Sequence, residues 1–402
     1  MIQSFNKIYK VTGTLSLSGD KSISHRELLI SSLAEGKSYL KNLSNSDDVK
    51  STISCLQALG IEIEFNEKEL IVNGRGYKGY RQPLNSLNAG NSGTTARLLA
   101  GILVAQNFES IITGDASLSS RPMKRVIEPL TEMGAKIKAN KGGKLPLYIS
   151  SAEILKSIRY ELPVPSAQVK SAILFAGLHL DEQTSVIELI QTRNHTENLL
   201  DLNVIKEEGR ITSSVSRRNY PKPIDYFIPG DISSAMFFIV LALLVKNSEL
   251  SIKDVSLNST RIECLKLLIR MGGNIQIEEK GSSNNEVYGD LLVKSSELSN
   301  VKIDKQIIPL IIDEIPILAV AGVFADGDFE LRGASELRVK ESDRIKAICA
   351  NLFKLGLAVE EFEDGFSISG SIKKQSEPFY SFGDHRIAMA FAILSLLMNS
   401  GG

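Results

Sequence analysis

Short turns rich in Gly, Ser and Asp open runs of small and apolar residues at six places in the chain. The six openings lie 65 to 83 residues apart and begin at Gly19, Gly90, Pro165, Gly230, Asp313 and Gly383. Runs that are apolar on all sides are typical of buried helices. The most apolar run, Ala235 to Val245, has eleven residues, against the roughly 20 that a membrane-spanning helix needs. The pattern predicts six related units, each begun by a core helix.

A second helix is predicted in each of the first five units, where it ends at a glycine 41 to 44 residues after the opening turn. These glycines are Gly60, Gly134, Gly209, Gly272 and Gly356. Glycine at a helix end is typical of a left-handed stop. All but Gly209, which fits least well, lead into alternating apolar residues that predict a strand. Repeated helix and strand modules indicate the α/β class.

Six units in 402 residues exceed a single hydrophobic core, and Pro221, Pro223 and Pro229 cluster between the third and fourth units. We therefore expect the chain to divide there, with three units on each side. Residues Lys280 to Glu286 are rich in Gly, Ser and Asn and are predicted to form an exposed hairpin loop. The sixth unit has one helix before Gly402, so the spacing of the other units predicts a further segment beyond that residue.

Composition narrows the functional classes. The chain has 46 Lys and Arg against 47 Asp and Glu, and this balance argues against broad nucleic-acid binding. Three cysteines and four histidines stand singly, without the spacing of a zinc site. The first ten residues do not resemble a secretory leader, and a cytoplasmic location is expected.

Basic residues recur near the predicted helix starts. Those of the first helices are Lys21, Arg26, Arg97, Lys170 and Arg386, and those of the second are Arg121, Lys124, Arg125, Lys340 and Arg344. A cation at a helix amino terminus is disfavoured by roughly 0.3 to 1 kcal/mol, so the repetition indicates bound phosphate or carboxylate groups. Each motif alone is also typical of an ordinary helix cap. Two carboxylates among these cations, Asp313 and Glu341, suit acid and base catalysis on an anionic substrate.

Seven motifs resemble those of the enolpyruvyl transferases, in particular the EPSP synthase family. They are GDKSISHR, GNSGTTAR, SRPMKR, PSAQ, GDISSA, LRVKESDRI and GDHRIAMA, in the family's order from residue 19 to 390. The resemblance implies an inside-out α/β barrel fold with two similar domains, each of three βαβαββ repeats, and a cleft between them. It implies one discontinuous domain of residues 1–18 and 228–402, with a truncated last repeat, and a second domain of residues 19–227.

The resemblance also implies a reaction: transfer of the enolpyruvyl group of phosphoenolpyruvate to the 5-hydroxyl of shikimate 3-phosphate, without a metal or cofactor, in a monomer. The residues implied for shikimate 3-phosphate are Lys21, Ser22, Arg26, Ser166, Ala167, Gln168, Arg193, Asp313 and Lys340. Those implied for phosphoenolpyruvate are Lys21, Asn91, Gly93, Arg121, Gln168, Arg344 and Arg386. Asp313 resembles the base that takes the hydroxyl proton, Glu341 resembles the acid that protonates the methylene carbon, and Lys21 and His385 are further candidates for proton transfer.

Two alternatives stay open. A sister enzyme transfers the same group to UDP-N-acetylglucosamine, but it has Lys-Asn where this chain has Lys21-Ser22 and usually a reactive Cys where this chain has Ala116 to Ser120. A phosphometabolite-binding protein without chemistry would gain from losing Asp313 and Glu341.

In this family the herbicide glyphosate occupies the phosphoenolpyruvate site. Four stretches of this chain, which begin at Gly19, Ser166, Arg193 and Asn258, resemble the pattern of glyphosate-tolerant members. Gly93 favours sensitivity, because tolerant forms often carry a methyl group there. The balance of these motifs favours tolerance.

Overall fold

The computed structural model describes residues 3–66, 69–373 and 378–398, and the chain divides into two compact units. Unit 1 comprises Met1–Leu17, Gly230–Gly281 and Val287–Gly402. Unit 2 comprises Ser18–Pro229 and Ser282–Glu286. The expected boundaries lie one and two residues from these, but the inclusion of residues 282–286 in unit 2 was not expected. Each unit has its own cluster of buried apolar side chains.

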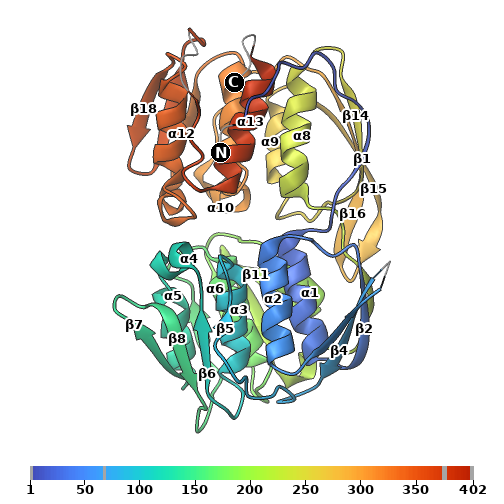
Figure 1. The fold of residues 1–402 in the computed structure, drawn as a ribbon, viewed down its shortest axis with the longest axis vertical. Helices are drawn as coiled ribbons and strands as arrows, with labels where there is room; N and C mark the ends of the chain where they lie inside the picture. The colour runs from blue at the N-terminus through green and yellow to red at the C-terminus, as the bar shows by residue number, and fades with distance from the viewer. Residues whose placement is uncertain (1–2, 67–68, 374–377, 399–402) are drawn as a thin grey trace. The chain divides into compact units, whose positions relative to one another are not determined.

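Unit 2 contains three helices that are buried on nearly all sides, and its sheets lie outside them (Figure 1). The buried helices are α1 (Lys21–Leu33), α3 (Gly93–Leu103) and α6 (Ala167–Gly177). The other helices are α2 (Asp47–Ala58), α4 (Ala116–Ser120), α5 (Lys124–Glu132) and α7 (His195–Leu199). Because α3 and α6 bury side chains over most of their surface, they are stable only when covered by other elements. This arrangement brings the starts of the buried helices into contact.

Three four-stranded sheets cover this interior, with the orders β13-β2-β4-β3, β5-β6-β8-β7 and β9-β10-β12-β11. The first sheet has β13 (Asp225–Phe227), β2 (Glu35–Lys41), β4 (Glu69–Arg75) and β3 (Glu62–Phe65). The second has β5 (Leu87–Asn88), β6 (Ser110–Thr113), β8 (Lys144–Ser150) and β7 (Lys136–Asn140). The third has β9 (Arg159–Glu161), β10 (Thr184–Glu188), β12 (Arg210–Val215) and β11 (Asn203–Glu207). Each sheet begins with a parallel pair and continues antiparallel, as a βαβαββ repeat requires.

Unit 1 repeats this plan. Its buried helices are α8 (Ile232–Leu244), α11 (Ile315–Phe324) and α13 (His385–Leu397), and these three contact one another. The remaining helices are α9 (Glu263–Arg270), α10 (Ile308–Ile311) and α12 (Arg344–Phe353). Its first sheet has β1 (Thr12–Ser16), β14 (Glu249–Ser256), β16 (Glu286–Lys294) and β15 (Asn274–Ser283), and its second has β17 (Phe329–Leu331), β19 (Gly365–Ser369) and β18 (Ala358–Phe362). In the described part of the sixth repeat, α13 is the one helix.

The first strand of each unit comes from a distant part of the chain. In unit 1, β1 pairs in parallel with β14, with Thr12 opposite Glu249. In unit 2, β13 pairs in parallel with β2, with Asp225 opposite Tyr39. The chain therefore starts in unit 1, builds unit 2 and returns, which makes unit 1 discontinuous.

Most predicted elements are present, with two corrections. Gly60, Gly134, Gly272 and Gly356 all follow helices with positive φ, between 73° and 101°. Gly209 instead lies in the tight turn between β11 and β12, and α7 ends ten residues earlier at Leu199. The third repeat's second helix has only five residues, so a spacing measured from longer helices placed its end in the following hairpin.

The second correction concerns the loop between β15 and β16. Its predicted exposure is wrong at Glu286, whose side chain is fully buried. The prediction rested on a local Gly, Ser and Asn composition, which does not reveal that other residues of unit 2 cover this tip.

The three cysteines are all buried. Burial raises the pKa of Cys55 to about 12 and also raises the pKa of Cys264 and of Cys349. Over the described residues, no single helix is long and apolar enough to cross a membrane. One pair of helices, Lys305–Ile311 and Ile315–Phe324, has the necessary length and apolar character only together, and it is bent by 116°.

Candidate active site

The predicted site residues fall into two groups, one at the helix starts of each unit. In unit 2, α1, α3 and α6 are capped by Asp20, Ser92 and Ser166, whose side chains each accept a hydrogen bond from a backbone N–H of the first turn. Side chains connect the capped ends: Gln168 Nε2 donates to Thr94 Oγ1 at 2.9 Å. These starts therefore form one surface of backbone donors and positive helix ends.

Two predicted cations belong to α1. Lys21 is partly exposed, with its Nζ 2.8 Å from Asp48 Oδ2. Arg26 is buried, and its guanidinium donates to the Ser22 carbonyl, to Ser171 Oγ and to Thr196 Oγ1 at 2.8 to 2.9 Å. Arg26 is thereby held rigidly beneath the surface of helix starts.

The electrostatics around Arg26 favour an anion. Burial lowers the pKa of Arg26 to about 10, the carboxylate of Glu197 opposes this shift, and the nearby guanidinium of Arg193 adds to it. A guanidinium whose pKa is lowered by burial and by a neighbouring cation would be stabilised by an anion beside it. Arg193 and Arg26, both expected at the shikimate 3-phosphate site, are thus brought together.

The start of α3 gathers a second set of cations. Asn91 Oδ1 accepts from Arg121 Nη2 at 2.5 Å, and Asn91 Nδ2 donates to Asp115 at 2.7 Å. Arg97 Nη1 donates to Gln168 Oε1 at 2.7 Å. A Cβ atom on Gly93 would lie 2.6 Å from Arg97 Nη1 and 3.6 Å from Arg121 Nη1. Both guanidinium groups therefore border the bare backbone of Gly93.

Arg97 is the residue that the sequence analysis left out of the expected site. It was noted among the basic residues near helix starts that indicate bound anions, but it was assigned to neither substrate. Its bond to Gln168, and its closeness to Gly93, place it directly among residues expected to bind phosphoenolpyruvate. Its position one turn into α3, on the same face as the capped start, is a sequence signal that could have found it.

For Lys170, the structure corrects the expected role in anion binding. The repeated pattern grouped it with the anion-binding cations, but its side chain is fully buried. Its Nζ lies 2.6 Å from Glu188 Oε2 and 2.6 Å from Glu197 Oε1. Both carboxylates already compensate its charge, so Lys170 stabilises the protein interior rather than an anionic ligand.

Unit 1 organises its group around Arg344, which is 1% exposed. Its Nε donates to Asp384 at 2.8 Å, its Nη1 to Asp313 at 3.3 Å and its Nη2 to Glu341 at 2.5 Å. Burial alone would lower the pKa of Arg344, but these three carboxylates outweigh it and raise that pKa. One guanidinium thus fixes both carboxylates that were predicted to act as base and acid.

The remaining predicted residues of unit 1 surround Asp313. Lys340 Nζ lies 3.8 Å from Asp313 Oδ1, and Arg386 Nη1 donates to the Asp313 carbonyl at 3.0 Å. His385 is exposed at the first position of α13. Asp313 and Glu341 keep partly exposed side chains, at 17% and 23%, so they remain open to a ligand.

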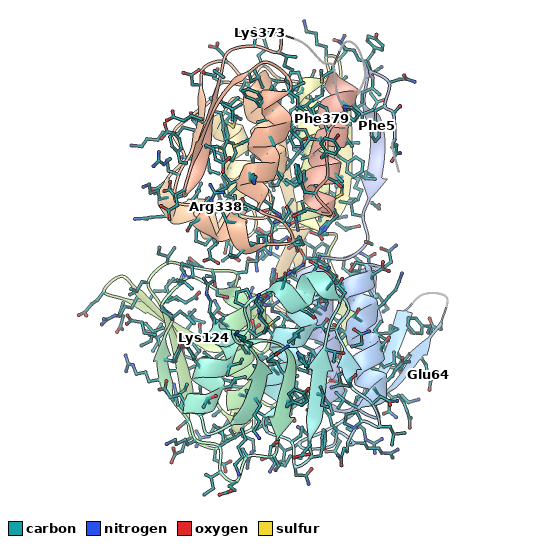
Figure 2. The ribbon with its side chains drawn as sticks, turned by 60° about the vertical axis from the view of Figure 1, so that its left-hand side comes forward. Phe5, Glu64, Lys124, Arg338, Lys373 and Phe379 are labelled. Carbon is teal, nitrogen blue, oxygen red and sulfur yellow. The ribbon has the colours of Figure 1, made fainter. Side chains whose placement is uncertain are left out.

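Arg338, labelled in Figure 2, holds the loop that carries Lys340 and Glu341. It donates to the carbonyls of Phe362 and Glu363 and to Asp343, whose side chain caps α12. The loop is therefore tied both to the second sheet and to the helix that bears Arg344.

A further charged cluster of unit 1 was not predicted. At the start of α8, Arg261 Nη2 donates to Ser233 Oγ at 2.6 Å, and Ser233 Oγ also bonds Glu314. Glu314 follows Asp313 directly and lies 4.0 Å from Arg386 Nη1. The motif at Gly230 was noted in the sequence, but Glu314 and Arg386 come from later repeats. Across the described ranges, no group of three or more His, Cys, Asp or Glu side chains has the arrangement of a metal site.

Comparison with known proteins shows which family the chain belongs to. A family model described as EPSP synthase (3-phosphoshikimate 1-carboxyvinyltransferase) matches residues 5–401. The chain belongs to the EPSP synthase family. Among its relatives, the 3-phosphoshikimate 1-carboxyvinyltransferase of Petrotoga mobilis is 47% identical over 396 residues, which cover 97% of this chain and 91% of the relative. That of Solibacter usitatus is 47% identical over 389 residues, with 96% and 91% coverage.

Solved structures agree with this family assignment. An EPSP synthase structure of Acinetobacter baumannii is 38% identical to this chain, with a TM-score of 0.82. The match covers 98% of this chain and 90% of the Acinetobacter chain. The enolpyruvyl transferase NikO of Streptomyces tendae has a TM-score of 0.72 at 14% identity, which shows a shared fold. The predicted fold class, a two-domain enolpyruvyl transferase fold in the α/β class, is confirmed.

Proposed function

We propose that this chain transfers the enolpyruvyl group of phosphoenolpyruvate to the 5-hydroxyl of shikimate 3-phosphate and releases phosphate. The observation that carries the proposal is the pair of ion pairs that the Arg344 guanidinium makes with Asp313 and Glu341. Two oriented, partly exposed carboxylates suit a reaction that removes one proton and adds another. Family membership agrees with this chemistry, because the family model is described by that transferase name.

Shikimate 3-phosphate is assigned to the start of α1 and its neighbours. Its phosphate would accept hydrogen bonds from Lys21 and Ser22, above the paired guanidinium groups of Arg26 and Arg193. Ser166, Ala167 and Gln168, at the capped start of α6, complete this group in unit 2. The family resemblance assigns Asp313 and Lys340 to the same substrate.

Phosphoenolpyruvate is assigned to the residues that the family resemblance implies for it. The residues are Lys21, Asn91, Gly93, Arg121, Gln168, Arg344 and Arg386. The absence of a side chain at Gly93 lets the anion approach the backbone N–H groups at the start of α3. Arginine favours carboxylate and phosphate groups, because its fork matches their two oxygens.

The chemistry then follows from the two carboxyls. Asp313 accepts the proton of the 5-hydroxyl while that oxygen attacks C2 of phosphoenolpyruvate. Glu341 gives a proton to C3, so the methylene becomes a methyl group in a tetrahedral adduct. Loss of phosphate from C2 and of a methyl proton to Glu341 forms the product, and release of the proton held by Asp313 restores the site. The surrounding cations offset the repulsion between the two anionic substrates. Lys21 and His385 are further candidates for proton transfer.

No step in this scheme requires a metal or an organic cofactor. We place the protein in the cytoplasm as a monomer, with small-molecule substrates and neither nucleic acid nor membrane as partner. The alternative acceptor, UDP-N-acetylglucosamine, is disfavoured by Ser22 and by the absence of a cysteine between Ala116 and Ser120.

The decisive experiment measures phosphate release from phosphoenolpyruvate. Purified protein is mixed with phosphoenolpyruvate and either shikimate 3-phosphate or UDP-N-acetylglucosamine. Release with shikimate 3-phosphate alone is expected. Release only with the nucleotide sugar would establish the sister activity, and binding of both anions without release would establish a binding protein.

A further inference from the structure

The hairpin of β15 and β16 starts in unit 1, but its tip, residues 282–286, belongs to unit 2. Asn284 and Asn285 both have positive φ, 43° and 64°, as a two-residue hairpin turn with this twist requires. The turn directs Glu286 into the interior, where its side chain is fully buried. A fully buried carboxyl at a hairpin tip indicates a specific partner.

That partner is α7. Glu286 Oε1 lies 2.8 Å from His195 Nδ1 and accepts from Asn198 Nδ2 at 3.2 Å. Asn284 Nδ2 donates to the Leu199 carbonyl at 3.2 Å, and Asn285 Nδ2 donates to the Asn198 carbonyl at 3.1 Å. The tip therefore binds both the first and the last residues of this helix.

A helix of five residues is not stable by itself. External contacts must therefore hold α7 in place, and the hairpin tip supplies them at both ends.

The position of α7 matters because it carries groups of the proposed phosphate site. Thr196 Oγ1 accepts from Arg26 Nε at 2.8 Å and lies 2.7 Å from Ser171 Oγ. Arg193 precedes the helix by two residues and contributes to the lowered pKa of Arg26. A shift of α7 would displace one guanidinium and remove a hydrogen-bond acceptor from the other.

We propose that Glu286 is a positioning residue for shikimate 3-phosphate, and that it acts through His195 and α7 on Arg26 and Arg193. The inference rests on the proposed function of this site. It assigns a role in substrate binding to a residue that lies 91 positions along the chain from His195 and that itself touches no substrate.

The test compares three variants by steady-state kinetics. Glu286→Ala removes the acceptor and is expected to raise the KM for shikimate 3-phosphate about tenfold or more, because charge-assisted hydrogen bonds are the strong ones. The KM for phosphoenolpyruvate and kcat should change less than about twofold. Glu286→Gln keeps a carbonyl oxygen for His195 and Asn198 and should restore most of the affinity. Glu279→Ala, at an exposed position of β15, is the matched control and should behave as the unaltered protein.

Calorimetric titration with shikimate 3-phosphate alone gives a second readout, in which the dissociation constant should rise by the same factor as the KM. If Glu286→Ala does not fold, Asn284→Gly, which tolerates the positive φ of this turn and removes the hydrogen bonds to the Leu199 carbonyl and to Glu27, should show a smaller but equally selective rise. An unchanged KM for shikimate 3-phosphate, or an equal rise in both KM values, would overturn the inference. If the unaltered protein releases no phosphate with shikimate 3-phosphate, the proposed function fails instead.

Discussion

Replacement of Lys170 by methionine tests the distinction between a cation that serves the interior and one that serves a ligand. The Lys170, Glu188 and Glu197 side chains are 1%, 2% and 3% exposed, and Lys170 Nζ is 2.6 Å from each carboxylate. Burial would lower the pKa of Lys170, but the two carboxylates outweigh it and raise that pKa. The ammonium is therefore charged in the folded protein at neutral pH and holds both acids.

Methionine has a similar length but no charge, so Lys170→Met leaves two buried carboxylates without their cation. Removal of one partner from a buried ion pair typically costs about 3 to 5 kcal/mol. Residual hydrogen bonds from Thr192 to Glu188 and from Ser213 to Glu197 favour the lower end of this range at pH 8.

The measurement is urea unfolding followed by far-UV circular dichroism, with hydrogen exchange of the α6 amides to locate the loss. Lys124→Met is the matched control: Lys124, labelled in Figure 2, pairs with Glu128 at 3.3 Å, with side chains 71% and 53% exposed. An exposed pair contributes about 0 to 1 kcal/mol, so the control should be nearly neutral. A Lys170→Met variant that is as stable as the unaltered protein, but no longer binds shikimate 3-phosphate, would refute the reasoning.

Three further predictions concern catalysis, pH and the bare backbone at α3. Asp313→Ala and Glu341→Ala should each lower kcat for phosphate release by about 100-fold or more, while circular dichroism shows an intact fold. Burial raises the pKa of Glu27 to about 8, helped by Glu286 and opposed by the Asn284 hydrogen bond. Between the ordinary pKa range of a carboxyl and pH 8, the unfolded chain therefore binds fewer protons than the folded chain. The free energy of unfolding should fall in this range as the pH rises, by up to about 1.4 kcal/mol per pH unit. Glu27→Gln should remove this slope, as measured by urea unfolding. Gly93→Ala places a methyl group 2.6 Å from Arg97 Nη1, so it should displace that guanidinium from Gln168 and raise both the KM for phosphoenolpyruvate and the inhibition constant of glyphosate about tenfold.

Each of these has an outcome that would contradict it. Near-normal turnover in both carboxylate variants would mean that other groups act as base and acid. Glu64→Gln, labelled in Figure 2 at an exposed position of β3, is the control for Glu27, and equal pH slopes in the two variants would exclude the buried carboxyl as the cause. An unchanged KM for phosphoenolpyruvate in Gly93→Ala would show that Arg97 does not position Gln168.

Local sequence determined the parts of this protein that depend on neighbouring residues. The helix starts at Asp20, Ser92 and Ser166, and the left-handed stop at Gly60, could be predicted because a cap or a glycine acts within one turn of its own position. The repeat spacing and the motifs likewise placed the expected cations at helix starts. The end of the short helix α7 was predicted wrongly, because the stability of this helix comes from contacts outside its own sequence.

Only the tertiary structure decided what each charge does. Lys170 and Arg97 occupy comparable places near helix starts, yet Lys170 is enclosed by Glu188 and Glu197, whereas Arg97 borders Gly93. Glu286 becomes a buried partner of His195 although the two lie 91 residues apart. The cost or benefit of a charge depends on its burial and on the opposite charges within a few ångströms, and the chain supplies those neighbours only when distant repeats pack together.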